Sequence, residues 1–317
     1  MARGWLERLG LHRPELRAWA LYDWANSVFM TTVLQVFPPF FVAYASRGVA
    51  PDVAGARFAF STSLAVVVVG VAGPVLGAVA DVRAAKKRFL AAFLVVGVVA
   101  TGSMAFIGEG QWGLALTLFV IGNIGATSTL AFYNSLLPGI ARPDELDRVS
   151  TAGFAIGYLG GGLLLALNLA AISSPETFGL PGAAAATRAA FASAAVCWAL
   201  FSIPLFRRVP EPPRAPEGRA NPGQSLLAAT FRGLARTFRD LRRFRQALLM
   251  LVAFLIYNDG IGTIIRMAAA QRVASTGSRR GASRPKARRP ARTSVRSASS
   301  LRAGMIARRS SSKDREL

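Results

Sequence analysis

Several residue types are scarce in this sequence, and each scarcity excludes a class of protein. The one cysteine, Cys197, excludes an internal disulfide, and the one histidine, His12, excludes a His-rich metal site. Charged residues make up only 17% of the chain, against about a quarter in soluble domains. The sequence also lacks a Ser/His/Asp set, a metal cluster and a phosphate-binding glycine loop. We therefore expect neither a soluble enzyme nor a bound cofactor.

Apolar residues are abundant instead, and they are clustered. They make up 52% of the 317 residues, and the mean hydropathy is +0.38. Runs of bilayer-crossing length predict seven membrane helices. These lie at roughly 17–44, 58–80, 89–108, 113–137, 151–172, 188–206 and 247–270. The sequence thus predicts an all-α membrane protein, with membrane lipid as its first partner.

Glycines inside these runs would weaken soluble helices. Gly70, Gly73 and Gly77 recur in the second run, and five more glycines lie between Gly153 and Gly162 in the fifth. In a membrane bundle such residues let two helix backbones approach closely. They therefore predict close helix packing.

Acidic residues are also scarce. The chain has 16 Asp and Glu but 38 Lys and Arg, which gives a net charge of +22. The loops on the N-terminal side of the predicted spans carry 20 Lys and Arg, whereas the other side carries three at most. Cytoplasmic loops of membrane proteins are enriched in Lys and Arg. We expect a multi-pass protein of the cytoplasmic membrane with a cytoplasmic N-terminus, and no specific nucleic-acid partner.

The long loop 207–246 begins with prolines and then becomes Arg-rich. Apolar residues recur at helical spacing, including Leu227, Phe231, Leu234 and Phe238. One interpretation is an amphipathic helix on an anionic membrane surface. A solvated charged loop is the alternative.

Polar residues form stripes on three of the predicted spans. The first span carries Asp23, Asn26 and Ser27, the fourth carries Asn123, Thr127, Tyr133 and Asn134, and the seventh carries Asn258, Asp259, Thr263 and Arg266. Within each stripe most members recur at helical spacing and so share a face. The simplest interpretation is that all three stripes face a water-filled cavity between the helices.

A structural role is the alternative for these stripes. Asn, Ser and Thr in membrane helices often hydrogen-bond only to a neighbouring helix, at about 0.6 kcal/mol per bond. Asp23 lies near the start of its span and could instead reach the lipid headgroups. Ionisable groups inside a span are costly, so Asp23, Asp259 and Arg266 are the strongest functional candidates.

Five ordered motifs within residues 18–270 resemble the major facilitator superfamily, and within it the branch of the fungal vacuolar amino-acid effluxers. They are Ala18–Ser27 (AWALYDWANS), Phe37–Phe41 (FPPFF), Phe132–Pro138 (FYNSLLP), Gly157–Gly162 (GYLGGG) and Tyr257–Arg266 (YNDGIGTIIR). The resemblance implies a secondary transporter that works by alternating access.

The same resemblance implies a small polar substrate, with amino acids as one class, and coupling to protons. Asp23 and Asp259 would then carry the proton, and Arg266 would serve as a counter-ion or bind a substrate carboxylate. The remaining polar residues of the three stripes would line the substrate cavity.

The loop after the second span resembles the superfamily's Gly-x-x-x-Asp-Arg-x-Gly-Arg-Arg motif. Gly77 and Asp81 fit, and Lys86 and Lys87 keep the basic cluster, but Val82 replaces the usual arginine. We expect Asp81 to latch one conformation through a basic side chain or a helix terminus, with Arg83 as a candidate partner. The alternative is that this basic cluster only sets the orientation of the protein in the membrane.

The resemblance implies twelve helices, whereas the sequence predicts seven. The predicted divisions are a six-helix half (1–207), the linker (208–246), the seventh helix (247–270) and a basic, disordered tail (271–317). The tail could be out-of-frame sequence of a broken transporter gene, in which case the chain is a non-functional fragment. Alternatively the chain is a half-transporter that pairs with a partner chain, or the tail is a polyanion-binding interaction arm.

Overall fold

The computed structural model describes residues 2–212 and scattered positions between 232 and 257. Six candidate membrane spans lie within these residues. They are all helical, and the described part of the chain contains no strand. The predicted fold class is confirmed. The tail 271–317 and Asn258, Asp259, Thr263 and Arg266 lie outside the described residues.

The first span is a continuous helical run, Pro14–Ala45, that follows the short helix α1 (Ala2–Arg8). It comprises α2 (Pro14–Val28), a π-helical turn (Phe29–Val33), α3 (Leu34–Phe40) and a second π-helical turn (Phe41–Ala45). Pro38 and Pro39 lie inside α3. Proline removes a backbone donor and clashes with the preceding turn, so locally widened turns beside it are expected.

The other five spans are regular helices joined by short loops. They are α4 (Pro51–Arg83), α5 (Lys86–Ser103, extended by a 3₁₀ turn at Met104–Phe106), α6 (Trp112–Asn134), α7 (Leu146–Ser173) and α8 (Ala183–Arg208). Further 3₁₀ turns occur at Leu137–Gly139 and Pro175–Phe178. Each of the first six sequence-derived ranges overlaps its helix, but the second begins seven residues too late, and the fifth and sixth begin five residues too late.

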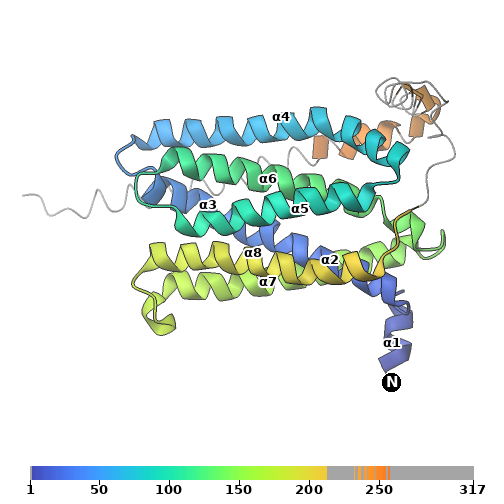
Figure 1. The fold of residues 1–317 in the computed structure, drawn as a ribbon, viewed down its shortest axis with the longest axis horizontal. Coiled ribbons are helices and arrows are strands. Elements are labelled where there is room, and N and C mark those ends of the chain that lie inside the picture. The colour runs from blue at the N-terminus through green and yellow to red at the C-terminus, as the bar shows by residue number, and fades with distance from the viewer. Residues whose placement is uncertain are drawn as a thin grey trace, which may run out of the picture. The chain divides into compact units, whose positions relative to one another are not determined.

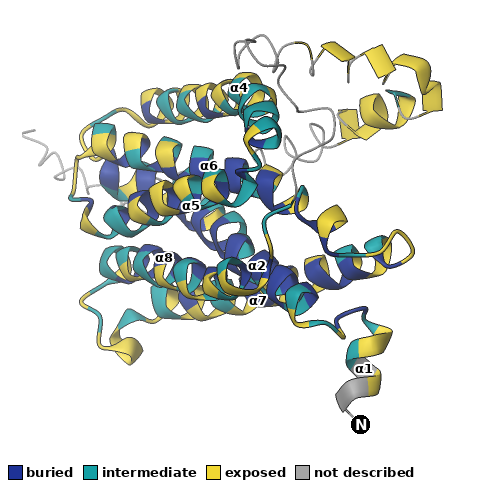
Figure 2. Cartoon of the chain, turned by 45° about the vertical axis from the view of Figure 1, so that its right-hand side comes forward, coloured by how far each residue is buried: buried dark blue, intermediate teal, exposed yellow. Residues whose placement is uncertain are grey.

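The six runs lie side by side (Figure 1). The α2 helix packs mainly against α7 and α8, α5 packs against α6 and α8, and α4 packs against α6. Buried residues concentrate along α2 and the faces turned toward it, while α4 is largely exposed (Figure 2). Aromatic rings fill much of this core: Phe37 stacks on Phe119 with ring centroids 4.3 Å apart.

Two glycine contacts set the closest helix approaches. A Cβ on Gly125 of α6 would lie 2.6 Å from the Cα of Gly97 on α5, so the two backbones touch. On α7, Gly153, Gly157, Gly160 and Gly161 lie directly against side chains of the first span. The predicted role of the fifth-span glycines is confirmed for these four. Gly162 and the α4 glycines have no atom within 4 Å of a built Cβ, so the described residues do not show that role for them.

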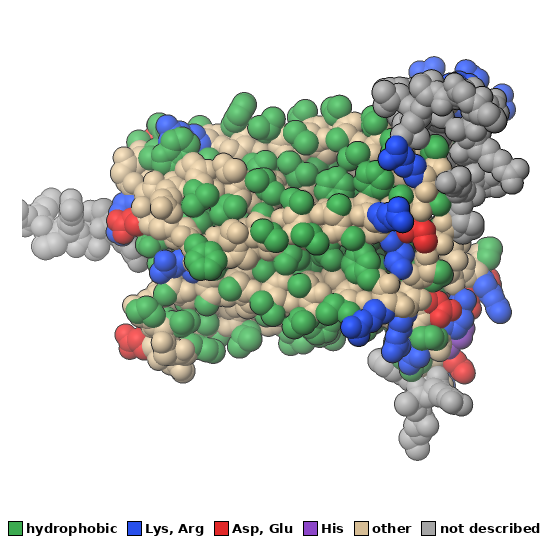
Figure 3. All heavy atoms as spheres, viewed as in Figure 1, with side chains coloured by type: hydrophobic (Ala, Val, Ile, Leu, Met, Phe, Trp, Pro, Cys, Tyr) green, Lys and Arg blue, Asp and Glu red, His purple; other side chains and the backbone are tan. Residues whose placement is uncertain are grey.

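Lys and Arg side chains gather at one end of the bundle. Figure 3 shows them at the end that holds the N-terminus and the α4–α5 turn, with an apolar band over the helix middles. The opposite end carries few, among them Arg47, which pairs with Glu109 at 2.6 Å. The arrangement matches the charge asymmetry of the predicted loops.

Candidate functional site

Asp23 of α2 lies at the interface with α7. Its residue is only 4% exposed, and it forms no hydrogen bond or ion pair with any described residue. A Cβ on Gly157 would overlap the Asp23 carboxylate and lie 2.7 Å from the Ser27 hydroxyl oxygen. The absence of a side chain at Gly157 therefore makes the space that holds this acid.

Asn26 turns from the same helix toward α6. The Thr129 hydroxyl lies 3.3 Å from the Asn26 Oδ1 and 2.8 Å from the Ala126 carbonyl oxygen, so it can donate to either. Asp23 and Ser27 thus lie against α7, whereas Asn26 contacts α6. The first-span stripe is divided between two helix interfaces.

Tyr133 of α6 is fully buried beside this stripe. Its ring stacks on Trp19 with centroids 4.4 Å apart and lies 4.9 Å from the ring of Tyr22. The Trp19 Nε1–H donates to the Tyr133 carbonyl oxygen at 3.1 Å. The hydroxyls of Tyr22 and Tyr133 are buried and have no hydrogen-bond partner among the described residues. Buried hydroxyls without partners are uncommon, and these two place polar groups inside an aromatic part of the core.

The other predicted cavity residues of α6 lie elsewhere. Asn123 and Thr127 are half-buried, and the Thr127 hydroxyl donates to the Asn123 Oδ1 at 3.2 Å. Asn134 is exposed. The described residues therefore place Asp23 and Ser27 against α7, and Asn26 and Tyr133 at the contact of the first span with α6. They leave Asn123, Thr127 and Asn134 on a separate face of α6.

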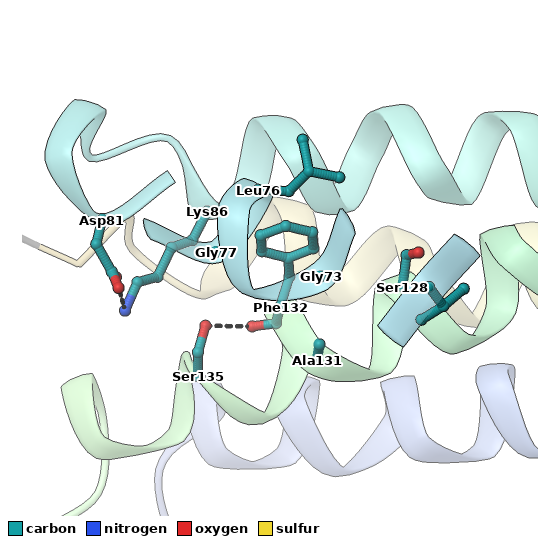
Figure 4. Close-up of a pocket in the computed structure, with 10 residues that line it drawn as sticks. Gly73, Leu76, Gly77, Asp81, Lys86, Ser128, Ala131, Phe132 and Ser135 are labelled. Atoms are coloured by element: carbon teal, nitrogen blue, oxygen red, sulfur yellow. Dashed lines mark hydrogen bonds and ion pairs between the residues drawn. The ribbon is translucent and has the colours of Figure 1, made fainter. Parts of the chain in front are cut away.

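The predicted latch loop borders a small cavity of about 90 Å³ between α4 and α6 (Figure 4). Gly73 and Gly77 line it from α4, and Ser128 and Ser135 line it from α6. At its edge the Lys86 Nζ lies 2.8 Å from the Asp81 Oδ1. Asp81 is therefore paired with Lys86, while Arg83 is exposed.

Lys87 has a different partner, which the sequence did not indicate. Its Nζ donates to the carbonyl oxygens of Phe206 (3.1 Å) and Val209 (2.5 Å) at the end of α8. Its backbone N–H donates to the carboxylate of Glu211 at 3.0 Å. Lys87 thus fixes the α4–α5 turn to the start of the linker. The Pro-Glu-Pro-Pro sequence at 210–213 was the available signal for an ordered acid there.

A second missed contact joins the start of α2 to the start of α7. The Arg13 guanidinium lies 2.8 Å from the Glu145 Oε2, and the His12 Nε2 lies 3.6 Å from the Glu145 Oε1. The Arg142 backbone N–H also donates to this carboxylate at 3.2 Å. That hydrogen bond, assisted by the positive charge of Arg13, lowers the pKa of Glu145 below its ordinary value.

Six membrane-length helices, with a buried acid that has no partner among the described residues, define a multi-span helical membrane protein. The chain matches the family described as "Vacuole effluxer Atg22 like" over residues 11–276. It belongs to this family, a branch of the major facilitator superfamily.

Two relatives illustrate the match. The uncharacterized MFS-type transporter YxiO of Bacillus subtilis is 31% identical over 253 residues, which cover 79% of this chain and 58% of the relative. Autophagy-related protein 22 of Coccidioides immitis is 24% identical over 270 residues, covering 66% of this chain and 44% of the relative. The chain thus spans about half the length of these relatives. No solved structure matches it.

Proposed function

We propose that this chain acts as a secondary transporter that moves a small polar solute by alternating access, with protons as the coupling ion. The observation that carries the proposal is Asp23, an acid buried within a membrane span without a partner among the described residues. An ionised carboxylate buried inside a membrane span without a partner is energetically costly. An acid in that position is favoured when it is neutral, and it can take up and release a proton.

The surroundings of Asp23 support this role. Ser27 and the unpartnered hydroxyls of Tyr22 and Tyr133 supply polar groups near the acid without fixing its charge. Asp259 is the second proposed proton carrier, and Arg266 is the proposed counter-ion or carboxylate-binding residue. Asn123, Thr127, Asn134, Asn258 and Thr263 complete the proposed substrate contacts. We propose amino acids as the first substrate class, since the relatives include proteins of the vacuole effluxer family.

The charged end of the bundle supports a cytoplasmic N-terminus in the cell membrane. Lys and Arg concentrate where the N-terminus, the α4–α5 turn and the end of α8 meet (Figure 3). Such an excess marks the cytoplasmic side of a membrane protein.

Counterflow in proteoliposomes tests transport separately from proton coupling. Vesicles that contain the purified chain are loaded with one unlabelled amino acid and diluted into a trace of the same labelled compound, for each amino acid in turn. We expect label to accumulate transiently for at least one of them. Label that never exceeds the level in protein-free vesicles would contradict transport by this chain and favour the fragment interpretation.

A further inference from the structure

An apolar groove runs between α5 and α8 on the outer face of the bundle. It has a volume of about 330 Å³, and its lining includes Val95 and Val99 of α5 and Ala199, Ile203 and Arg207 of α8. Val99 is 61% exposed and Ile203 is 40% exposed, although both belong to membrane-length helices. Side chains of this kind in a membrane span contact lipid hydrocarbon.

The groove has one cationic end. Arg207 lines it there, and Arg88 lies two helical turns before Val95, on the same face of α5. Both arginines are exposed, and neither forms an ion pair with any residue that the structure describes. The Lys87 contacts with Phe206 and Val209 hold the ends of these two helices together.

The length of the groove fits one leaflet. From Ala199 to Arg207, α8 rises about 12 Å, and half of the hydrocarbon core is about 15 Å thick. An acyl chain that follows the groove from the bilayer interior would therefore place its headgroup beside Arg207.

We propose that this groove binds an anionic phospholipid, with its acyl chain between α5 and α8 and its phosphate against Arg88 and Arg207. Arginine binds phosphate through a planar set of donors. The same arginines repel the choline cation of a zwitterionic headgroup, so an anionic headgroup is favoured. The chain's own C-terminal part is a poor occupant, because residues 213–317 carry 23 Lys and Arg but only 5 Asp and Glu. A second copy docked through the same groove would bring the same arginines together.

Native mass spectrometry of the full chain in detergent tests the headgroup contact. Dioleoylphosphatidylglycerol and dioleoylphosphatidylcholine are titrated separately, so that only the headgroup differs. We expect at least about fivefold tighter binding of the anionic lipid, since a basic residue near an anionic surface contributes about 1 kcal/mol. Arg207→Gln and Arg88→Gln should each weaken it about fivefold, while Arg208→Gln, an exposed neighbour outside the groove, should change it less than twofold.

A second variant and its control test the contact between the acyl chain and the groove. Ala199→Phe fills the groove and should weaken binding of both lipids, whereas Leu200→Phe, next to it but not in the groove lining, should not. Equal losses from Arg207→Gln and Arg208→Gln would show diffuse attraction and overturn the site. Unchanged lipid binding by Ala199→Phe would also overturn it. Lipid binding is measured without transport, so its outcome does not depend on the proposed function.

Discussion

At the residue scale, the contact between Gly157 and Asp23 connects packing with function. The glycine leaves the space that the acid occupies, and a methyl group there would overlap the carboxylate. An identical substitution at Gly162, on the same helix, would meet nothing within 4 Å. The two positions therefore separate the effect of crowding Asp23 from the general effect of adding a methyl group to α7.

Gly157→Ala should destabilise the purified protein by about 1–3 kcal/mol, the usual range for overpacking a filled interface. Gly162→Ala should be neutral or slightly stabilising, because alanine favours a helix more than glycine does. Thermal unfolding of both variants in one detergent measures the difference. Equal melting temperatures for the two variants would show that Gly157 does not pack against Asp23.

Glu145 gives a pH-dependent contact at the residue scale. Its pKa in the folded protein is lowered, so its contribution to stability is present above its ordinary pKa and is lost as pH falls through the lowered value. Glu145→Gln should therefore reduce the melting temperature at pH 7. The difference from the unsubstituted protein should shrink as pH falls below about 4.5, the ordinary pKa of a glutamate side chain.

Asp144→Asn is the matched control, because Asp144 is the exposed neighbour and forms no ion pair with the described residues. It should leave the melting temperature nearly unchanged at both pH values. A Glu145→Gln effect as large at pH 3 as at pH 7 would show that the carboxylate's charge is not its cause.

At the element scale, two adjacent lysines begin α5 with different roles. Lys87 bonds to backbone carbonyls at the end of α8, while Lys86 forms a partly exposed ion pair with Asp81. Hydrogen bonds from a charged group contribute about 1.5–3 kcal/mol, whereas exposed ion pairs contribute about 0–1 kcal/mol. Anchoring of α8 should therefore depend on Lys87 alone.

Lys87→Met should lower the melting temperature and speed proteolysis after residue 209, since the end of α8 and Glu211 lose their shared partner. Lys86→Met, with the same loss of charge one position earlier, should do much less. Timed proteolysis followed by mass determination of the fragments measures both. Equal cleavage rates in the two variants would contradict the anchoring role.

The elements themselves could be predicted from the sequence, but their neighbours could not. Apolar run length and charge spacing located six spans, because both follow from the thickness of the bilayer. The start of α4 was placed too late, since Arg57 and Asp52 look like loop residues although the helix continues past the hydrocarbon. Arg57 lies 4.0 Å from the centroid of the Trp112 ring, a contact that no local pattern indicates.

The candidate site was predicted in composition but not in arrangement. Spacing correctly put Asp23 and Ser27 on one side of their helix, yet it could not assign Asn26 to α6 or Tyr133 to the aromatic stack with Trp19. Likewise the expected latch partner Arg83 is exposed and Lys86 takes its place. Such choices depend on which helices become neighbours, a long-range property that one sequence does not state.

At the scale of the whole molecule, the concentration of cationic side chains at one end predicts the orientation. In a Cys197→Ser background, a cysteine introduced at exposed Ser174 should react with a membrane-impermeant maleimide on intact cells. A cysteine at exposed Arg83 should react only after the membrane is opened. The reverse pattern would place the N-terminus outside and contradict the proposed orientation.

Substrate-induced proton uptake measures whether Asp23 carries the proton proposed to drive transport. Proteoliposomes holding a pH-sensitive dye receive the amino acid that shows counterflow, with the unsubstituted protein, Asp23→Asn or Asp52→Asn, a change at an exposed acid at the start of α4. We predict that Asp23→Asn abolishes proton uptake but retains counterflow, and that Asp52→Asn retains both. Full proton uptake by Asp23→Asn would show that Asp23 does not carry the coupling proton.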